Sequence, residues 1–314
     1  MWAQRSVLGG LAAAACVWLS ARASASPDVV SGAAEGSAVP GAASPAPTPM
    51  SSNRVQLLLP ASSGRIRLAA ATLHQGSTRE EISELAAECN RRAGAEVCRP
   101  STFAHELRTR PEIFVPAFAL DRLEVSLGAY LRCVRSGRCA PPRVSSPGDE
   151  ESPLELPAVG VTRADAAMHC AFAGGRLPRE DELERAARGA SGRRYPWGAL
   201  FHTGRVNGGA FGVAGTERAD GYERLAPVAA FSDGRTPEGI LQLSGNVEEW
   251  TADGDEPDSA SAGMAAVRGG HFASPPHELR AAARRIVPVD SWGPSLGFRC
   301  AHDVRGRRQR TAAK

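Results

Sequence analysis

The sequence predicts an α+β fold, made of a single loop-rich domain with little regular secondary structure. Composition is the first reason, because 33 glycines and 23 prolines among 314 residues favour turns and irregular chain over a helical bundle. The second reason is the order of the elements, since short alternating segments and short capped helices follow one another without an internal repeat. A chain of this length can bury one large core or two modest ones.

The charge is nearly balanced, with a formal net charge of +3 at pH 7. The basic footprint of a nucleic-acid-binding protein is therefore missing, and we expect no nucleic acid among the partners. Residues 304–314 form a short basic tail, which we expect to be disordered and solvated. Contact of this tail with an anionic envelope surface is the alternative.

Residues 1–25 have the features of a signal peptide. Arg5 supplies a positive start, residues 7–19 are apolar but too few to span a membrane comfortably, and residues 23–25 (Ala-Ser-Ala) match a cleavage site. We therefore expect an exported protein, periplasmic or extracellular. Cys16 leaves open an outer-membrane lipoprotein, although the leucine usual three residues before such a cysteine is absent. A lipid on Cys16 would then be the link to the membrane.

Residues 26–53 consist mainly of Ala, Pro, Ser and Gly, and they predict a flexible tether because they have little apolar surface to bury. The folded domain is expected over residues 54–303. Its first strand is predicted at 65–68, where apolar and charged residues alternate. A helix follows over 78–92, capped by Thr78 with Glu81 three residues later.

Residues 112–123 predict two strands interrupted at Pro116. A helix is expected over 127–134, then a short strand over 157–161, and then a helix capped by Thr162. Gly174 and Gly175 are expected to end that helix. A last helix is expected from the acidic Glu180 to Arg188. From residue 199 to the end we expect loops to dominate.

Six cysteines remain after Cys16, an even number that suits an oxidising compartment. Fifteen pairings are possible in principle. Cysteines that flank a short loop are the simplest to pair, which predicts disulfides between Cys89 and Cys98 and between Cys133 and Cys139. Cys170 and Cys300 then remain. A zinc site is the alternative, but no CxxC pair or histidine spacing supports it.

The stretch LQLSGNVEEW, residues 241–250, predicts a loop built for oxygen ligands. Gly245 can adopt backbone angles closed to other residues, which lets neighbouring carbonyls point at one spot. Glu249, four residues on, could close a ring of oxygens around a hard cation. A hairpin turn that ends in a buried Trp250 is the alternative.

Five motifs occur in a characteristic order: GGRLPREDELERAARG (174–189), YPWG (195–198), LSGNVEEW (243–250), VRGGHF (267–272) and GFRCA (297–301). Together with FALDRLEVSLGAYLRCVRSGRC (118–139), the chain resembles the sulfatase-modifying-factor domain of formylglycine-generating enzymes. The resemblance covers about residues 65–302. It implies a single α+β domain related to C-type lectins and a disulfide between Cys170 and Cys300.

The resemblance also implies two structural calcium sites. The ligands of the first would be Asn207, Gly208, Asp220 and Tyr222. The ligands of the second would be Gln242, Gly245, Val247 and Glu249. Side-chain and backbone oxygens suit Ca²⁺, but Gln242 departs from the usual Asn or Asp and weakens the second set. Alternatively, both acids brace loops through backbone N–H groups.

The enzymes of this family oxidise a substrate cysteine with two cysteines that hold Cu(I). Ser274 and Leu279 stand at those two positions here. A hydroxyl is a poor ligand for Cu(I) and a hydrocarbon is none, so we expect no catalytic residue and no copper. The resemblance therefore predicts a pseudoenzyme.

The former substrate groove, near His271, Ser274, His277 and Trp292, is the expected contact surface. The hypothesis is an exported binding or scaffolding module of the bacterial envelope, with a protein, peptide or glycan as partner. The alternative is a formylglycine-generating-type oxidoreductase that oxidises a thiol through a non-standard metal site. A Ser274 nucleophile activated by a flanking histidine has no third group to orient it. Lectin-like sugar binding rests on fold analogy alone.

Overall fold

The computed structural model describes residues 64–93, 96–107, 112–144, 154–209, 220–253 and 263–304. These residues all fall in one compact unit of the chain, Leu57–Lys314. The predicted signal peptide, Cys16, the tether and residues 305–314 of the tail lie outside the described residues. Among the described residues no helix has both the length and the apolar character needed to cross a bilayer.

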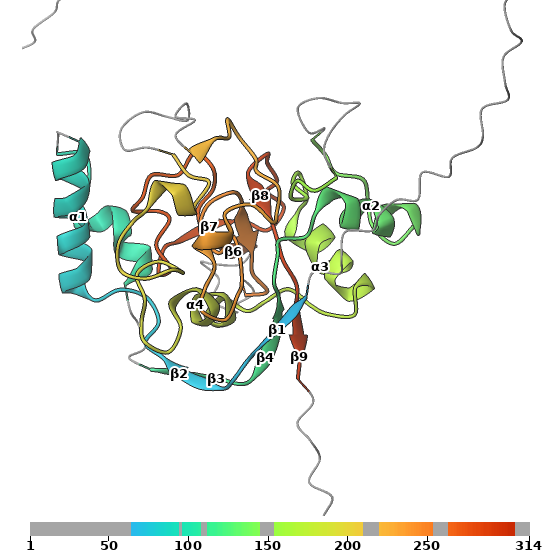
Figure 1. Ribbon diagram of the computed structural model, residues 1–314, viewed down its shortest axis with the longest axis horizontal. Helices are drawn as coiled ribbons and strands as arrows, with labels where there is room; N and C mark the ends of the chain where they lie inside the picture. The colour runs from blue at the N-terminus through green and yellow to red at the C-terminus, as the bar shows by residue number, and fades with distance from the viewer. Residues whose placement is uncertain are drawn as a thin grey trace, which may run out of the picture. The chain divides into compact units, whose positions relative to one another are not determined.

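A three-stranded antiparallel sheet joins the two ends of the domain (Figure 1). Its order is β1 (Arg65–Leu68), β4 (Phe118–Asp121) and β9 (Ala301–Asp303), with β4 in the centre. β2 (Ala71–Leu73) pairs separately with β3 (Ile113–Val115). The predicted interruption at Pro116 thus separates β3 from β4, as expected for a residue without a backbone donor.

The helices begin where the sequence places capping residues. They are α1 (Arg79–Ala93), the 3-10 helix η1 (Pro100–Glu106), α2 (Leu127–Arg135), α3 (Arg163–Phe172) and α4 (Glu180–Arg188). The Thr78 hydroxyl accepts from the Glu81 N–H at 3.1 Å, and the Glu81 carboxylate accepts from the Thr78 N–H at 2.7 Å. Thr162 and Asp165 form the same reciprocal pair at the start of α3. Each pair satisfies two backbone donors that the helix leaves open.

Loops dominate from residue 199 onward, as predicted, but the sequence did not predict the short strands among them. A four-stranded sheet lies there in the order β7 (Arg284–Pro288), β6 (Met264–Arg268), β5 (Glu248–Trp250) and β8 (Leu296–Gly297). β7 carries two consecutive arginines and lacks the apolar alternation expected of a strand. The predicted strand at 157–161 is instead one isolated bridge, Ser126 with Pro157. Two short 3-10 turns, η2 (Thr203–Arg205) and η4 (Ser232–Gly234), complete this half.

The main core packs α2 and α3 against the second sheet. Trp250, Tyr130 and Phe298 are fully buried in it. Two of the predicted disulfides, Cys133–Cys139 and Cys170–Cys300, lie in the same core. The second of these joins residues 130 positions apart, so it ties α3 to the strand end before β9.

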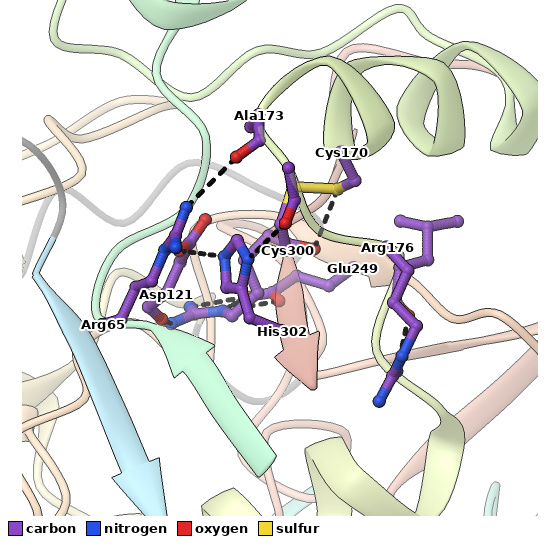
Figure 2. Close-up of a disulfide and its surroundings, with 11 residues drawn as sticks. Arg65, Asp121, Cys170, Ala173, Arg176, Glu249, Cys300 and His302 are labelled. Atoms are coloured by element: carbon purple, nitrogen blue, oxygen red, sulfur yellow. Dashed lines mark hydrogen bonds and ion pairs between the residues drawn. A yellow bond between two sulfur atoms is a disulfide. The ribbon is translucent and has the colours of Figure 1, made fainter. Parts of the chain in front are cut away.

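Beside the Cys170–Cys300 disulfide, β4 and β9 meet through a buried pair (Figure 2). The His302 ring nitrogen Nε2 lies 3.0 Å from the Asp121 carboxylate. Arg65 donates to the Ala173 carbonyl at 3.1 Å, which fastens β1 to the end of α3. The long disulfide and these polar contacts together hold the N-terminal and C-terminal strands in place.

Candidate functional site

Asn246 is the centre of a buried polar network in the loop before β5. Gly245 and Asn246 both adopt positive φ angles, 76° and 62°, which turns the chain sharply. The Asn246 amide then donates to Glu124 at 2.7 Å, and its oxygen accepts from the Asn207 amide at 2.9 Å. It also accepts from the Ala226 N–H at 2.9 Å. One fully buried side chain therefore holds three separate segments together.

Three ionisable side chains lie in or next to that network: Glu124, Glu249 and Arg299. Arg299 is fully buried and donates to both oxygens of Glu249 at 2.7 Å, and it also donates to the carbonyls of Leu241 and Gln242 at 2.9 and 3.0 Å. Burial, and then the charge of Glu249, raise the pKa of Glu124 well above its ordinary value. Glu124 therefore takes up a proton more readily than a solvated carboxylate does, while Glu249 has a cationic partner.

The first set of predicted calcium ligands comes together in the structure. The Asn207 amide nitrogen donates to Arg224 O at 2.7 Å and to Asn246, so its oxygen is assigned without ambiguity. That buried oxygen has no hydrogen-bond partner among the described residues. Asp220 accepts from the N–H groups of Gly208 and Tyr222, both at 3.0 Å. An unpartnered buried amide oxygen beside a carboxylate fits a hard cation, and the same contacts also fit the alternative in which Asp220 braces its loop.

The second set of predicted ligands is arranged differently. Both oxygens of Glu249 accept from Arg299, and the Gln242 amide nitrogen faces the Pro227 carbonyl at 3.4 Å. A guanidinium next to the carboxylate opposes a second cation there. Calcium at Gln242, Gly245, Val247 and Glu249 stays a prediction that these contacts do not favour.

The two positions where the family places copper ligands contain no sulfur. Ser274 is buried and donates to the Glu278 carboxylate at 2.9 Å. Leu279 is fully buried and packs in an apolar cluster with Tyr195 and Val206. A leucine that fills a core position leaves no room for a metal ion at that point.

A small cavity lies beside these two positions. Its volume is about 110 Å³, and it is lined by η1, by the Gly269–Gly270 turn, by β7 and by His277 and Glu278. Of the four residues of the predicted groove, His277 lines this cavity and His271, Ser274 and Trp292 do not. Trp292 is half exposed on the loop between β7 and β8. His271 Nδ1 accepts from the Ala273 N–H at 3.1 Å, so this ring nitrogen is used within its own turn.

Two sulfur atoms lie close to His277, one of the residues that line the cavity. Cys89 on α1 and Cys98 before η1 form the third predicted disulfide. One ligand atom from each of Cys89, Cys98 and His277 lies within 4.8 Å of the others. The sequence predicted the disulfide but not its position next to His277.

Sequence reasoning missed three residues of the site: Glu124, Asn246 and Arg299. Asn246 carried a signal, because an asparagine directly after a glycine in a turn is a common choice for positive φ. Glu124 and Arg299 lie in quoted motifs, yet nothing local shows that charged side chains there are buried.

Comparison with known proteins identifies the same domain. Residues 74–304 match the sulfatase-modifying factor enzyme 1-like domain. The inactive C-alpha-formylglycine-generating enzyme 2 of Mus musculus is 42% identical over 156 residues, which cover 47% of this chain and 49% of the relative. The formylglycine-generating enzyme of Thermomonospora curvata is 38% identical over 173 residues, covering 47% of this chain and 55% of the relative. The chain therefore spans about half the length of these relatives.

Solved structures share the fold. PvdO from Pseudomonas aeruginosa superposes with a TM-score of 0.54 and 22% identity, covering 76% of this chain and 94% of PvdO. CarF superposes with a TM-score of 0.51 and 16% identity, covering 77% of this chain and 98% of CarF. At this level of identity the likeness shows the α+β fold alone.

Proposed function

Because the chain belongs to the sulfatase-modifying factor family, we propose that it is a non-catalytic member acting as an exported binding or scaffolding module of the bacterial envelope. The burial of Leu279 carries this proposal. The family reaction needs two thiolates at positions 274 and 279, and the structure has a hydrogen-bonded hydroxyl and a core leucine there. The name of the mouse relative, an inactive enzyme, supports the same reading.

The cavity beside Ser274 favours a peptide as the partner. At about 110 Å³ it is well below the ~300–1,000 Å³ typical of small-molecule sites, so it suits one inserted side chain. The charges around it are already paired, because Arg280 donates to both oxygens of Glu106 at 2.7 Å and Arg285 donates to Glu248 at 2.9 Å. A neutral side chain therefore enters more readily than a charged one.

A structural calcium ion at Asn207 and Asp220 is part of the proposal. Calcium would use the unpartnered Asn207 oxygen and the Asp220 carboxylate, and it would hold this loop in place. The loop reaches the cavity wall through Ser274, because the Gly209 N–H donates to the Ser274 carbonyl at 3.0 Å and the Ser274 hydroxyl donates to Glu278, which lines the cavity.

The absence of family chemistry is tested with a cysteine-containing peptide incubated with copper and oxygen. The enzyme of Thermomonospora curvata serves as the positive control, and the product aldehyde is captured with a hydrazide and weighed by mass spectrometry. We expect no formylglycine from this protein. Formylglycine formation would overturn the proposal, whatever metal the protein takes up.

Peptide binding is tested by selection from a displayed library. Peptides that use the cavity should lose binding at least tenfold in Ala283→Leu, which fills it, but not in Ile286→Leu, which changes an exposed residue of β7, the strand that follows Ala283. Equal binding by both variants would exclude the cavity as the contact surface. A glycan-array signal lost on chelation would favour a sugar partner instead.

A further inference from the structure

The second chemical feature near the cavity is the sulfur pair next to His277. Cys89 lies on α1, Cys98 precedes η1, and His277 belongs to the distant loop after Ser274. Their ligand atoms lie within 4.8 Å of one another although Cys98 and His277 are far apart in the sequence. This proximity is therefore created by the tertiary fold.

Two contacts fix the loop against η1. The His277 ring packs edge-to-face on Phe103 with centroids 5.6 Å apart. Arg280 donates to both oxygens of the buried Glu106 at 2.7 Å, a bidentate ion pair at the end of η1. The position of His277 relative to the sulfurs is thus held by a ring contact and by an ion pair.

The spacing suits a soft cation once the sulfurs are reduced. Zinc and monovalent copper bind thiolate sulfur at about 2.3 Å and imidazole nitrogen at about 2.0 Å, so ligand atoms in such a site lie about 3.5–4 Å apart. The Cα atoms of Cys89 and Cys98 are 6.0 Å apart, close enough for both sulfurs to reach one ion. When the S–S bond breaks, the two sulfurs can separate from about 2 Å to the spacing of a ligand pair, and the His277 ring nitrogen already lies within 4.8 Å of both.

Both sulfurs are shielded, since Cys89 is 2% and Cys98 is 9% exposed, but the chain on either side of Cys98 lies at the surface. The sulfur pair belongs to a small separate cluster under α1 and η1 rather than to the main core. Cys98 follows Val97, which is 64% exposed, and precedes the exposed Arg99. Reactivity of a disulfide depends on access of this kind.

We propose that Cys89, Cys98 and His277 form a redox-gated binding site for a thiophilic cation, zinc or monovalent copper. A dithiol supplies two electrons and two protons, the Cys89–Cys98 S–S bond breaks, and the dithiol becomes its own disulfide. The two thiols then lose their protons as their sulfurs bind the cation together with the neutral His277 ring. The oxidised protein has no such site. Because His277 also lines the cavity, the bound cation becomes part of the cavity wall.

The test compares the full chain before and after anaerobic treatment with dithiothreitol. Zinc is titrated in competition with a chromogenic chelator, and monovalent copper in competition with bicinchoninate. We expect one equivalent of cation to bind only after reduction, and the bound ion should protect Cys89 and Cys98 from alkylation. The two titrations separately identify which cation binds more tightly.

Variants separate this site from incidental thiol binding. Cys89→Ser/Cys98→Ser should abolish reduction-dependent binding, and His277→Gln should weaken it at least tenfold. His105→Gln is the matched control, because His105 is exposed and lines the same cavity. Circular dichroism checks that each variant is folded.

Three results would overturn the proposal. The first is that Cys89 and Cys98 resist reduction in the folded protein. The second is that the reduced pair binds neither cation. The third is that His277→Gln binds the cation as tightly as the unchanged chain, which would show that the two thiols bind it without the histidine.

Discussion

Two groups in this molecule have the same chemical composition and opposite surroundings. Cys89 and Cys98 lie in a small cluster under α1 and η1, next to His277 at a cavity wall, whereas Cys133, Cys139 and His169 lie in the main core. In both groups the three ligand atoms are within 4.8 Å of one another, and in both the sulfurs form a disulfide. Ligand spacing therefore cannot distinguish a structural clip from a reactive site.

The difference lies in the histidines. His169 is buried between aromatic rings, stacked on Tyr130 at 5.4 Å and edge-on to Phe298 at 5.4 Å. Burial, and then the charge of Arg132, lower the pKa of His169 to about 4. His277 is instead partly exposed at a cavity wall. A core histidine of this kind is held neutral as a packing element, while an edge histidine is placed to meet a ligand.

The largest expected effect is on stability when the disulfide of either group is removed. Cys133→Ala/Cys139→Ala should lower the free energy of unfolding by about 3–5 kcal/mol, because it opens the core as well as a covalent loop. Cys89→Ala/Cys98→Ala should cost about 2 kcal/mol, because it affects only the small cluster under α1. Urea denaturation followed by far-ultraviolet circular dichroism measures both. Equal losses would erase the distinction drawn between the two groups.

Calcium should stabilise the region around Cys89, Cys98 and His277 and not the region around Cys133, Cys139 and His169. Asn207 and Asp220 adjoin the loop of His277, and a side chain added at Gly208 would lie 2.5 Å from Leu279. Chelation should therefore lower stability by about 2.7 kcal/mol if calcium is present at a hundredfold excess over its Kd. It should also speed alkylation of reduced Cys89 and Cys98.

Calorimetry with and without chelator measures the stability change. Asn207→Ala should remove the response, and Asp233→Asn, at a largely exposed acid, is the control. A melting temperature that does not move on chelation would leave Asp220 as a brace for its loop and no more.

The core histidine should produce a larger pH dependence than the edge histidine, whose pKa is also lowered by burial. The folded pKa of His169, about 4, lies below its unfolded value of about 6.5, so the unfolded chain binds the proton first. Stability from this group is complete above pH 6.5 and falls as the pH drops toward 4. At pH 5 the loss is about 2 kcal/mol.

His169→Phe should flatten this dependence, and the measurement is urea denaturation at pH 7.5 and pH 5. His277→Gln is the comparison, and it should change stability at pH 7.5 by no more than about 0.5 kcal/mol. A slope that persists in His169→Phe would assign the pH dependence to other groups, with His271 and His277, whose pKa values burial also lowers, the first to test.

The sequence predicts the fold class, the helix starts and the disulfide partners because these depend on local patterns and parity. Thr78 and Thr162 illustrate this, since a capping residue acts within its own first turn. β7 was missed because its arginines, which pair with Glu180 and Glu248, hide the strand pattern. The approach of His277 to Cys89 and Cys98 could not be predicted, because it depends on the Arg280–Glu106 pair between distant segments.

The packing of Leu279 also bears on how the chain could change in future generations. A lineage that acquired a cysteine at 274 would gain nothing until 279 also changed. Replacing Leu279 with a smaller residue would leave a void among Tyr195 and Val206 and cost roughly 1–3 kcal/mol before any copper could compensate. A pair of copper-binding cysteines at 274 and 279 could thus be reached only through a destabilised intermediate.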